Sequence, residues 1–484
     1  MITEFALSQL YSELPDHAIL TDRYQKEPFE SDAYTVKKEL PGVVVLAETV
    51  EHVRSTLRVC NECDIPLVTR GAGTGLSGGA RPHREGVLLV LSKLNRVLEV
   101  DPQACTATVE PGTTNLRISE VAKEYGLFYA PDPSSQIACT IGGNVAENAG
   151  GVHCLKYGMT LHNVVGLTLL TIEGDELVLG GKAYDWEGYD FLALMVGSEG
   201  MLGVVTEISV KLLPIPAVRH VLLGGFDDVE IAGNCVAGII AAGVIPGGLE
   251  MMDELAVRAA EEFAEVGYPK DAKAVLLCEL DGTEEEVAST TDKVAEVMKQ
   301  FDASVIELAT DPEQCERLWR GRKVAFPAAG RMASDFYCMD GSIPRYQIGP
   351  VLKAINNMSE RYNLGVMNVF HAGDGNLHPL ILYDASDKKQ REGAEQFGAE
   401  ILEHCIRVGG TITGEHGVGV EKIDQMCSQF SLAEIEQFHR LRNVFDVNRN
   451  MNPGKAIPTL ARCSELGGMH VHKGQIPFPE LSRF

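Results

Sequence analysis

The sequence lacks long apolar runs, an export signal and a cysteine cluster, and it is poor in basic residues. No stretch of the 484 residues approaches the roughly 20 apolar residues of a membrane helix, and the N-terminus has no basic start followed by an apolar run. We therefore expect a cytoplasmic protein. The 42 Lys and Arg residues against 68 Asp and Glu residues give a net charge of −26, which disfavours binding to nucleic acid or to anionic membranes.

The twelve cysteines are scattered along the chain. Cys60 and Cys63 form the only CxxC pair, and no second pair completes a zinc or iron-sulfur site. In a long chain without export features, cysteines are expected to be reduced and to fill small apolar spaces rather than to form disulfides. An iron-sulfur relay that served this chain would therefore lie on another polypeptide.

The length and the periodicity of the chain predict more than one domain. With 45% hydrophobic and 23% charged residues, the chain has ample material for a core, but 484 residues exceed what one core usually supports. Residues 43–69 have the pattern strand, helix, strand. From residue 220, single strands alternate with long helices, which is typical of an α+β domain with a helix-covered sheet. From about residue 401 the pattern is mainly helical.

Residues 371–378 read His-Ala-Gly-Asp-Gly-Asn-Leu-His between apolar runs. Asp-Gly is a strong signal for a two-residue hairpin turn. If Asp374 and Gly375 form that turn, His371 lies directly opposite His378, with Cβ atoms roughly 4.5 to 5.5 Å apart, and the two imidazoles could share a divalent ion. Judged by this motif alone, a metal site and a plain hairpin with two partly exposed histidines are equally good interpretations.

Three segments are rich in glycine, hydroxyl and amide side chains: residues 70–80, 131–151 and 197–206. Glycine-rich backbone can turn its N–H groups toward phosphate oxygens. Gly73, Gly75 and Gly78 fit the GxGxxG formula, but Pro82 and a new strand near Val87 leave no room for the helix that a Rossmann site needs. We expect a dinucleotide site that is not an ordinary NAD site.

In combination, these motifs resemble a known family. The glycine-rich segments resemble the flavin-binding domain of the vanillyl-alcohol oxidase superfamily, and the histidine hairpin, residues 414–417 (Gly-Glu-His-Gly) and residues 452–455 (Asn-Pro-Gly-Lys) resemble its D-2-hydroxyacid dehydrogenase branch. The resemblance covers nearly the whole chain. It implies an α+β fold with an FAD-binding domain in residues 1–217, a substrate or cap domain with the hairpin in 218–405, and a helical C-terminal segment in 406–484 that completes the active site and flavin site.

By this resemblance the cofactor is FAD. Thr74 stands where relatives with covalently bound flavin carry a histidine, so we expect the FAD to be non-covalent. The first loop would hold the pyrophosphate, with Val204 near the adenine and Asn452 near the flavin ring. The expected cofactor-binding residues are Arg70, Gly71, Gly73, Thr74, Gly75, Ser77, Gly78, Pro131, Ser135, Thr140, Gly142, Gly143, Asn144, Gly150, Glu199, Gly203, Val204 and Asn452.

The same resemblance makes Glu415 the third ligand of a divalent metal, Zn²⁺ or Mn²⁺, together with His371 and His378. His416 would be the catalytic base. A 2-hydroxy acid bound to the metal would have an acidified hydroxyl, His416 would take its proton, and hydride would pass to flavin N5 to give the 2-keto acid. Without the other motifs, Glu415 and His416 would more often belong to a surface loop.

An acidic protein needs a fixed cation to hold the substrate carboxylate. Arg322 matches the carboxylate-binding arginine of the family, with Arg320 and Lys323 as weaker candidates and a solvated helix face as the alternative. After Arg322 the sequence departs from the better-known relatives, because Phe326 and Pro327 replace polar residues. This departure favours a small substrate.

We expect glycolate as the substrate and D-lactate next, with D-2-hydroxyglutarate as the alternative in the same class. A non-redox flavin-dependent transferase, or a metallohydrolase with an unrelated nucleotide domain, would be a different class. The resemblance also implies a companion flavin-domain-like subunit and an iron-sulfur subunit, which would pass electrons to a respiratory acceptor and attach the chain peripherally to the inner membrane. His470 and His472 in the tail are expected to be structural or to contact a partner.

Overall fold

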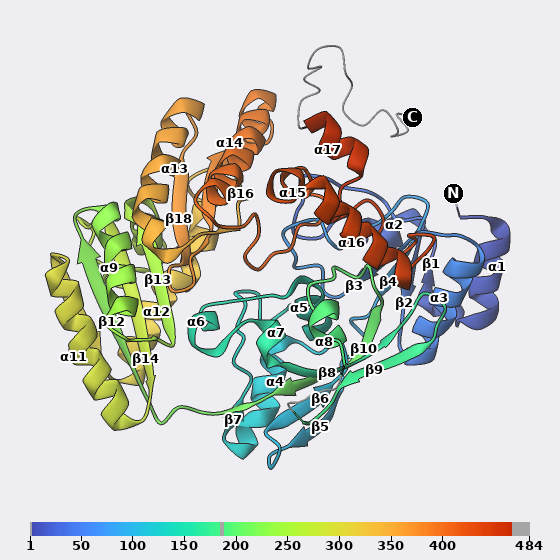
Figure 1. Cartoon of the computed structure of the whole chain (residues 1–484), viewed down its shortest axis with the longest axis horizontal. Coiled ribbons are helices and arrows are strands. Elements are labelled where there is room, and N and C mark those ends of the chain that lie inside the picture. Colours follow the sequence, from blue (N-terminus) through green and yellow to red (C-terminus); the bar gives the residue numbers. More distant parts are fainter. Residues whose placement is uncertain (1, 184–187, 467–484) are drawn as a thin grey trace. The chain divides into compact units, whose positions relative to one another are not determined.

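The computed structural model describes residues 2–183 and 188–466, which are drawn as ribbons in Figure 1. The chain divides into two compact units. Unit 1 consists of residues 1–149, 159–214 and 416–484, and unit 2 consists of residues 150–158 and 215–415. The expected C-terminal segment 406–484 is therefore shared between the two units, and the chain last changes unit between Glu415 and His416.

Unit 1 begins with a small sheet in the order β1-β2-β4-β3, of which β2, β4 and β3 are parallel. The predicted strand, helix, strand pattern is confirmed here, and Thr49 caps the helix by accepting a hydrogen bond from the backbone N–H of His52. Apolar residues of the sheet and helices form one core. The elements are α1 (Glu4–Glu13), η1 (Asp16–Ala18), β1 (Ile19–Leu20), α2 (Arg23–Lys26), η2 (Glu27–Phe29), β2 (Val43–Leu46), α3 (Val50–Glu62), β3 (Leu67–Arg70) and β4 (Val87–Val90).

A second, antiparallel sheet of unit 1 has the order β5-β6-β10-β8-β9. Strands β8 and β9 form a hairpin, in which Leu170 pairs with Glu176. Buried and half-buried residues alternate along β10, so one face packs onto a second core. The elements are β5 (Val97–Asp101), β6 (Thr106–Val109), α4 (Asn115–Ala122), η3 (Lys123–Tyr125), β7 (Leu127–Phe128), α5 (Ile141–Glu147), α7 (Thr160–Asn163), β8 (Val164–Leu170), β9 (Glu176–Gly180), α8 (Phe191–Met195), β10 (Val204–Lys211) and β11 (Leu213–Pro214), followed after unit 2 by α15 (Ile423–Gln429), α16 (Leu432–Phe445) and α17 (Leu460–Leu466).

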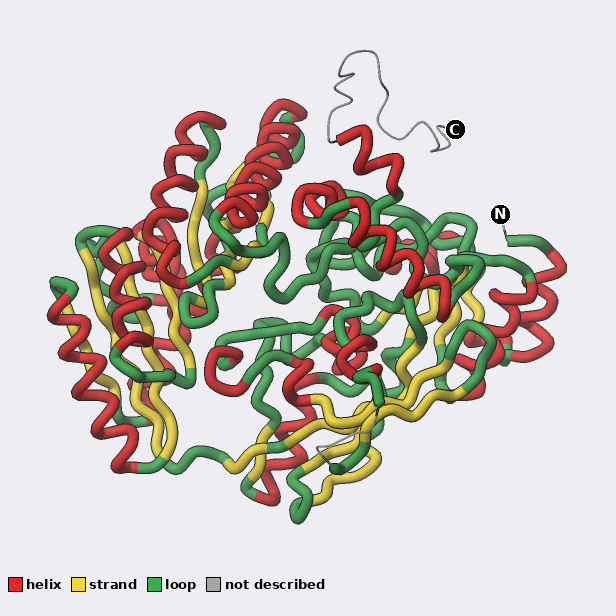
Figure 2. Tube along the Cα trace, in the orientation of Figure 1, coloured by secondary structure: helices red, strands yellow, loops and turns green. Residues whose placement is uncertain are grey.

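Unit 2 is built on an antiparallel sheet in the order β15-β12-β14-β13-β18, which continues from β18 through β19 to β17 and through β20 to β16. Helices cover both faces: α10 and α12 pack on the face that carries Val221 and Leu223, and α9 and α11 contact β12 and β14 (Figure 2). The elements are α6 (Cys154–Tyr157), β12 (Val218–Phe226), α9 (Val229–Ala241), β13 (Gly248–Asp253), α10 (Glu254–Ala264), β14 (Ala274–Gly282), α11 (Glu284–Gln300), β15 (Val305–Ala309), α12 (Pro312–Ala329), β16 (Asp335–Cys338), β17 (Gly341–Ser342), η4 (Arg345–Gln347), α13 (Ile348–Tyr362), β18 (Val366–His371), β19 (Asn376–Leu377), β20 (Pro379–Tyr383) and α14 (Lys388–Arg407).

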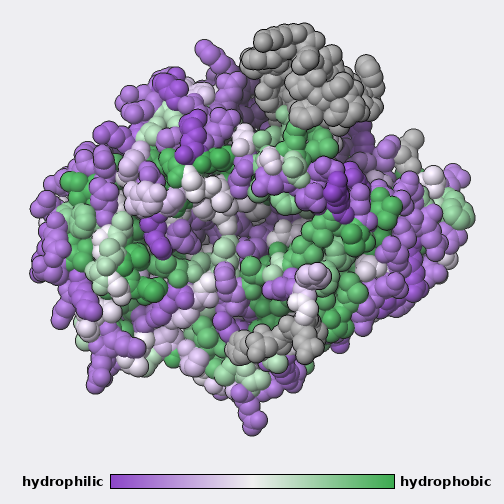
Figure 3. Space-filling model, viewed as in Figure 1, coloured by the Kyte–Doolittle hydropathy of each residue, from purple (hydrophilic) through white to green (hydrophobic). Residues whose placement is uncertain are grey.

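The mixture of helices with mainly antiparallel sheets confirms the expected α+β class. Hydrophilic side chains cover much of the face drawn in Figure 3, in agreement with the many charged residues of the chain. Among the helices that the structure describes, none is both long enough and apolar enough to span a membrane.

The expectation that the cysteines are all reduced was wrong for one pair. Cys427 on α15 and Cys463 on α17 form a disulfide with their Cα atoms 5.0 Å apart. They are 36 residues apart in the sequence, and only the packing of the two helices brings them within bonding range. The other ten cysteines form no disulfide within the described residues, and eight of them, including Cys60, are buried.

Candidate active site

The hairpin that carries the two histidines has a different register from the one expected. Strands β18 and β19 pair His371 with Asn376, so the connecting loop has four residues, and the predicted two-residue turn was wrong. The side chain of Asp374 accepts a hydrogen bond from the backbone N–H of Asn376 at 3.1 Å, and the N–H of Gly375 donates to the carbonyl of His371 at 3.2 Å. These two hydrogen bonds stabilise the four-residue loop.

Both imidazoles nevertheless lie on one face of the hairpin. The register differs by two residues from the expected pairing of His371 with His378, and an even shift keeps each side chain on its face because strand side chains alternate with a period of two. The two ring centroids are 5.0 Å apart with an interplanar angle of 88°, and both residues are buried. The prediction of two neighbouring histidines is confirmed despite the wrong turn.

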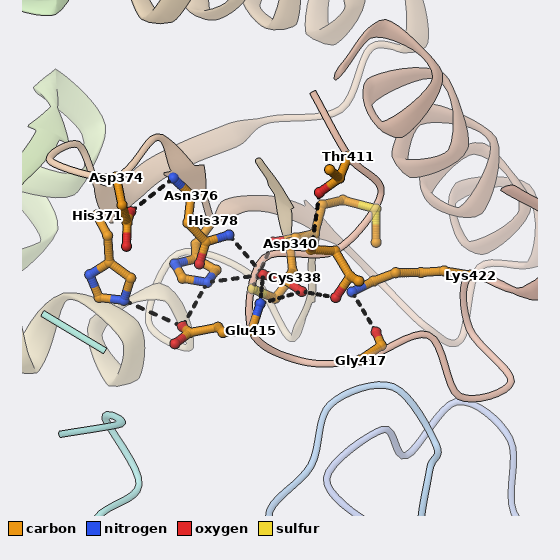
Figure 4. Close-up of polar contacts among 12 residues, drawn as sticks. Cys338, Asp340, His371, Asp374, Asn376, His378, Thr411, Glu415, Gly417 and Lys422 are labelled. Atoms are coloured by element: carbon orange, nitrogen blue, oxygen red, sulfur yellow. Dashed lines mark hydrogen bonds and ion pairs between the residues drawn. The ribbon is translucent and has the colours of Figure 1, made fainter. Parts of the chain in front are cut away.

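Glu415 joins these histidines to form a three-residue cluster within unit 2 (Figure 4). Its Oε1 lies 3.3 Å from Nε2 of His371 and 3.1 Å from Nε2 of His378. Backbone near Gly150 approaches closely, since a Cβ at that glycine would lie 2.7 Å from Oε2 of Glu415. Two nitrogens and a carboxylate oxygen in this arrangement are suitable donors for Zn²⁺ or Mn²⁺.

Asp340 fixes the loop that carries Glu415. This fully buried carboxylate accepts the backbone N–H of Glu415 at 3.1 Å, the side-chain amide of Asn376 at 2.8 Å and the hydroxyl of Thr413 at 2.7 Å. A single carboxylate therefore connects the hairpin to the 413–415 loop. Sequence reasoning missed Asp340, although an acidic residue next to the apolar run of β16 is a recognisable anomaly.

The cluster is held together by opposite charges. Burial by itself lowers the pKa of His371, but the carboxylates of Glu250 and Glu415 outweigh burial and raise that pKa well above its ordinary value. Burial alone would raise the pKa of Glu415, but His371 and His378 hold it well below its usual range. A buried carboxylate beside two imidazoles requires a cation, which is either a proton on a ring or a metal ion.

Glu250 connects the cluster to Arg322. Its Oε1 lies 2.7 Å from Nδ1 of His371, and its Oε2 accepts Nε–H of Arg322 at 2.7 Å. Burial raises the pKa of Glu250, but His371 and Arg322 outweigh it and leave the carboxyl with a lowered pKa. Sequence reasoning also missed Glu250, which could have been found as the one charged residue in the apolar strand β13 before its terminal Asp253.

Of the three cationic candidates on α12, only Arg322 is buried beside the cluster. Its terminal guanidinium nitrogens have no hydrogen-bond acceptor among the described residues, so they remain available as a fork. Arg320 donates to the carbonyl of Ala264 in an exposed position, and Lys323 pairs with Glu316 at 3.3 Å on the helix surface. The structure therefore favours Arg322 over the other two.

Phe326 lies one helical turn after Arg322 on α12 and on the same side of the helix. Its ring meets the ring of His378 edge to face, with centroids 6.2 Å apart, and also meets the ring of Phe336 at 6.5 Å. The cluster of His371, His378 and Glu415, called the hairpin cluster from here on, therefore has an aromatic ring packed beside His378. His416 directly follows Glu415 and precedes Gly417, whose φ of 78° permits a sharp turn.

The first glycine-rich loop, in unit 1, presents unused backbone donors. From Gly71 to Gly79, no backbone N–H donates a hydrogen bond to another described residue. Positive φ angles at Gly73 and Gly78 turn the chain in a way that only glycine adopts readily. Such a run of free amides fits the pyrophosphate of a dinucleotide.

Asn452 and Glu199 join the separate motifs of unit 1. The amide of Asn452 donates to the carbonyl of Glu199 at 2.6 Å and to that of Gly79 at 3.2 Å. The carboxylate of Glu199 accepts the backbone N–H groups of Val418 and Gly419, each at 2.8 Å. Oδ1 of Asn452 is buried without a hydrogen-bond partner among the described residues, which fits a missing polar ligand.

The other cofactor candidates differ in what they contact. Ser77 has a buried Oγ that no described residue contacts by a hydrogen bond, so it is another fit for a polar ligand. Several others serve the packing of unit 1, as Thr140 does by capping α5 and contacting Gly71. Gly150 differs from the rest, because it belongs to unit 2. The packing group also includes Arg70, which donates to Ser31; Gly142, which contacts Pro111; Asn144, which donates to Asn115; and Gly203 and Val204, which contact Leu169 and Leu170.

Lys455 is a further residue that sequence reasoning did not select. Its ammonium is buried and donates to the carbonyls of Gly79 at 2.8 Å and Arg81 at 2.5 Å. Desolvation lowers its pKa to about 7. A buried lysine that directly follows Asn-Pro-Gly could have indicated this position. His470 and His472 lie outside the described residues.

Comparisons with known proteins identify the family of the chain. Residues 41–180 match the FAD binding domain family and residues 215–456 match the C-terminal domain family of FAD linked oxidases. "Glycolate oxidase subunit GlcD" of Escherichia coli K12 is 53% identical over 99% of this chain and 96% of its own length. Mitochondrial "D-lactate dehydrogenase [cytochrome]" of Arabidopsis thaliana is 31% identical over 93% of this chain and 80% of its own length.

Solved structures show the fold. The structure of p-cresol methylhydroxylase superposes with a TM-score of 0.82 at 18% identity, covering 95% of this chain and 98% of that chain. The resemblance to FAD-linked hydroxyacid dehydrogenases, which rested on short motifs, is confirmed along nearly the whole sequence by the relatives named above. The chain belongs to the FAD-linked oxidases, in the family that includes the glycolate oxidase D subunits and the D-lactate dehydrogenases.

Proposed function

We propose that this chain oxidises a small 2-hydroxy acid, glycolate first and D-lactate second, to the corresponding 2-keto acid. The observation that carries the proposal is the meeting of His371, His378 and Glu415 with the buried Arg322 through Glu250. A metal-binding cluster and a free guanidinium fork in one place suit a substrate that offers a hydroxyl and a carboxylate. The match to relatives named for glycolate and D-lactate supports this choice.

The side chains have separate tasks in this proposal. Arg322 binds one side of the substrate carboxylate through its terminal nitrogens, which keeps the α-carbon in a fixed orientation. His371, His378 and Glu415 hold Zn²⁺ or Mn²⁺, which when bound supplies a Lewis acid that lowers the pKa of the substrate hydroxyl. His416 accepts the hydroxyl proton, a role suited to an imidazole that is neutral near pH 7.

FAD, when bound, supplies the two-electron oxidising capacity that the side chains lack. The free amides of the Gly71–Gly79 loop would hold its pyrophosphate, and Ser77 and Asn452 would contact it through their unpaired oxygens. Thr74 cannot form the covalent link that a histidine at this place could form, so the cofactor is dissociable. Flavin released from denatured protein into the supernatant is the expected result, and flavin retained on the polypeptide would contradict it.

We further propose that the electrons leave through partner subunits. The Escherichia coli relative is named as a subunit, which supports an assembly. A companion flavin-domain-like chain and an iron-sulfur chain would complete the path to the respiratory acceptor and attach the complex to the membrane surface. Co-purification of the native complex with iron in stoichiometric amount tests this assembly.

Anaerobic mixing of the purified FAD-loaded protein with glycolate tests the reaction. Loss of the yellow flavin absorbance at a rate that saturates with glycolate is expected, with D-lactate slower. D-2-hydroxyglutarate carries a second carboxylate, so faster bleaching by it would replace glycolate as the substrate. No bleaching by any 2-hydroxy acid would overturn the proposal.

The role of His416 is tested by His416→Gln. We expect flavin reduction to slow by roughly 10² to 10⁴ fold while metal content and FAD content stay unchanged. His439 is a matched control in the same unit, because it is a half-buried histidine on α16 that contacts the carbonyl of Pro458. His439→Gln should leave the reduction rate unchanged, and equal losses in the two variants would argue against a base at His416.

A further inference from the structure

Glu250 occupies a position that couples two parts of the candidate active site. It lies on β13 directly opposite His371 on β18, and it is fully buried. A pair opposed across two strands has a short and well-defined Cβ separation. The pairing of β13 with β18 therefore places the Glu250 carboxylate beside the His371 imidazole, independently of any loop.

Each oxygen of Glu250 has one partner. Oε1 lies 2.7 Å from Nδ1 of His371, and Oε2 accepts Nε–H of Arg322 at 2.7 Å. The contact with Nδ1 leaves Nε2 of His371 pointing at Glu415, so the ring presents its other nitrogen to the cluster. The contact with Nε leaves the two terminal nitrogens of Arg322 free, whereas an ion pair made only for charge balance would ordinarily use them.

We propose that Glu250 is the positioning residue that links metal binding to recognition of the substrate carboxylate. It holds His371 in the Nδ1–H tautomer that a metal ligand needs, and it holds Arg322 with its fork directed away from the pair. This inference rests on the proposed function. It adds that the two binding elements depend on one buried carboxylate, so that a substitution that breaks either contact of Glu250 disturbs the element on that side.

Replacing Glu250 with Gln separates positioning from volume. The amide has one acceptor oxygen and one donor nitrogen, so it cannot accept from both partners. If the oxygen faces Arg322, the NH₂ group favours the tautomer of His371 that carries its proton on Nε2, and metal affinity falls by roughly 10- to 100-fold. If the oxygen faces His371, two donors meet at Arg322 and the KM for glycolate rises by a similar factor.

Glu279 is a matched control in the same sheet. It lies on β14 and is equally buried, and it contacts Nε2 of His153 at 2.9 Å and accepts Nε1–H of Trp319 at 2.5 Å. It contacts neither the hairpin cluster nor Arg322. Glu279→Gln should lose stability in the same manner as Glu250→Gln, while its metal affinity and its KM for glycolate stay at the wild-type values.

Glu250→Asp adds a second test in case the Gln variant does not fold. Aspartate keeps the charge but is one methylene shorter, so it cannot span both contacts. If Glu250 served only to neutralise its neighbours, this variant would behave like wild type. As a positioning residue, Glu250 requires its length, and the Asp variant should also lose metal affinity or raise KM by at least about tenfold.

The measurements are competition of each apoprotein with a chromophoric chelator for Zn²⁺ and Mn²⁺, and steady-state KM and kcat with glycolate. Wild-type protein that binds neither ion would remove the metal from the proposed function and this inference with it. Wild-type protein that binds metal, together with Gln and Asp variants that match the Glu279→Gln control in affinity and KM, would overturn the role of Glu250 alone.

Discussion

Unit 1 and unit 2 prepare their candidate binding sites from different parts of the polypeptide. In unit 1 the Gly71–Gly79 loop offers backbone N–H groups, which are polar but uncharged. In unit 2 the hairpin cluster and Arg322 offer side chains that are buried and charged. When no ligand is present, uncharged N–H groups need no counter-charge, whereas buried charged side chains must neutralise one another.

This difference determines what each site tolerates. A backbone site depends on the φ and ψ angles of its loop and on the absence of side chains, so an added methyl group is its main hazard. A side-chain site depends on strand register and on charge balance, so deletion of one charge is its main hazard. The two sites should therefore fail independently, and single substitutions can test that independence.

The largest effect is expected for His371→Ala. Removal of one of two imidazole ligands should abolish tight metal binding, and loss of several kcal/mol of Lewis-acid assistance corresponds to a rate of flavin reduction lower by about 10³-fold or more. FAD should remain bound at wild-type stoichiometry because the variant leaves unit 1 unchanged. Metal analysis, flavin absorbance and stopped-flow reduction measure the three quantities. Full activity of metal-free wild-type protein would contradict the proposed role of the metal site in unit 2.

Gly73→Ala is the opposite test. Gly73 has a φ of 75°, and a Cβ there would lie 2.1 Å from the guanidinium of Arg70, so the loop must distort. FAD affinity should fall by roughly 10- to 100-fold, from about 1 to 2 kcal/mol of backbone strain plus the displaced side chain, while metal affinity is retained. Gly126→Ala is the control, because Gly126 has a φ of 72° but open space around it. If both variants lost FAD, the cause would be backbone strain in unit 1 in general and not the contact of a new side chain with Arg70.

The two sites were also unequal in how far the sequence predicted them. The loop around Gly73 and Gly78 could be identified from composition, because glycine spacing after a strand directly reflects backbone freedom. The neighbouring contacts could not be identified, since the bonds of Asn452 to Glu199 and Gly79 join segments more than 250 residues apart. Such pairs depend on how the whole unit packs.

In unit 2 the sequence predicted the histidines but not their surroundings. The two-residue turn failed because Asp374 binds the N–H of Asn376 and favours a four-residue loop, an interaction that turn statistics do not include. The prediction of two neighbouring histidines remained correct because the register error was two residues, which leaves each side chain on the same face of the hairpin. Glu250 and Asp340 were missed because each comes from a strand or loop distant in sequence, although a buried acidic residue in an apolar segment is a usable indication of a site.

Phe326→Ala tests whether the shape of the site in unit 2 selects the substrate in addition to its charges. The ring of Phe326 meets that of His378 at 6.2 Å, and its removal opens space beside the cluster without altering any charge. We expect the kcat/KM ratio of glycolate to a bulkier 2-hydroxy acid to fall by about tenfold, within the 1 to 3 kcal/mol typical of a hydrophobic pocket contact. Metal affinity should not change. An unchanged substrate ratio would place the size limit elsewhere.

The smallest effect concerns pH and separates the charged site from the uncharged one. The pKa of His371 is raised in the folded protein, so its contribution to apoprotein stability is fully present below its ordinary value of 6.5 and is lost as pH rises through the raised value. Metal binding requires a neutral imidazole, so the metal-loaded protein has no such loss. The difference in Tm between metal-loaded and apo protein should therefore widen as pH rises above 6.5. The proposed FAD site does not include His371, so the Tm increase that FAD causes should be the same in wild type and in His371→Ala at each pH. A difference between the two proteins would mean that the two sites are not independent.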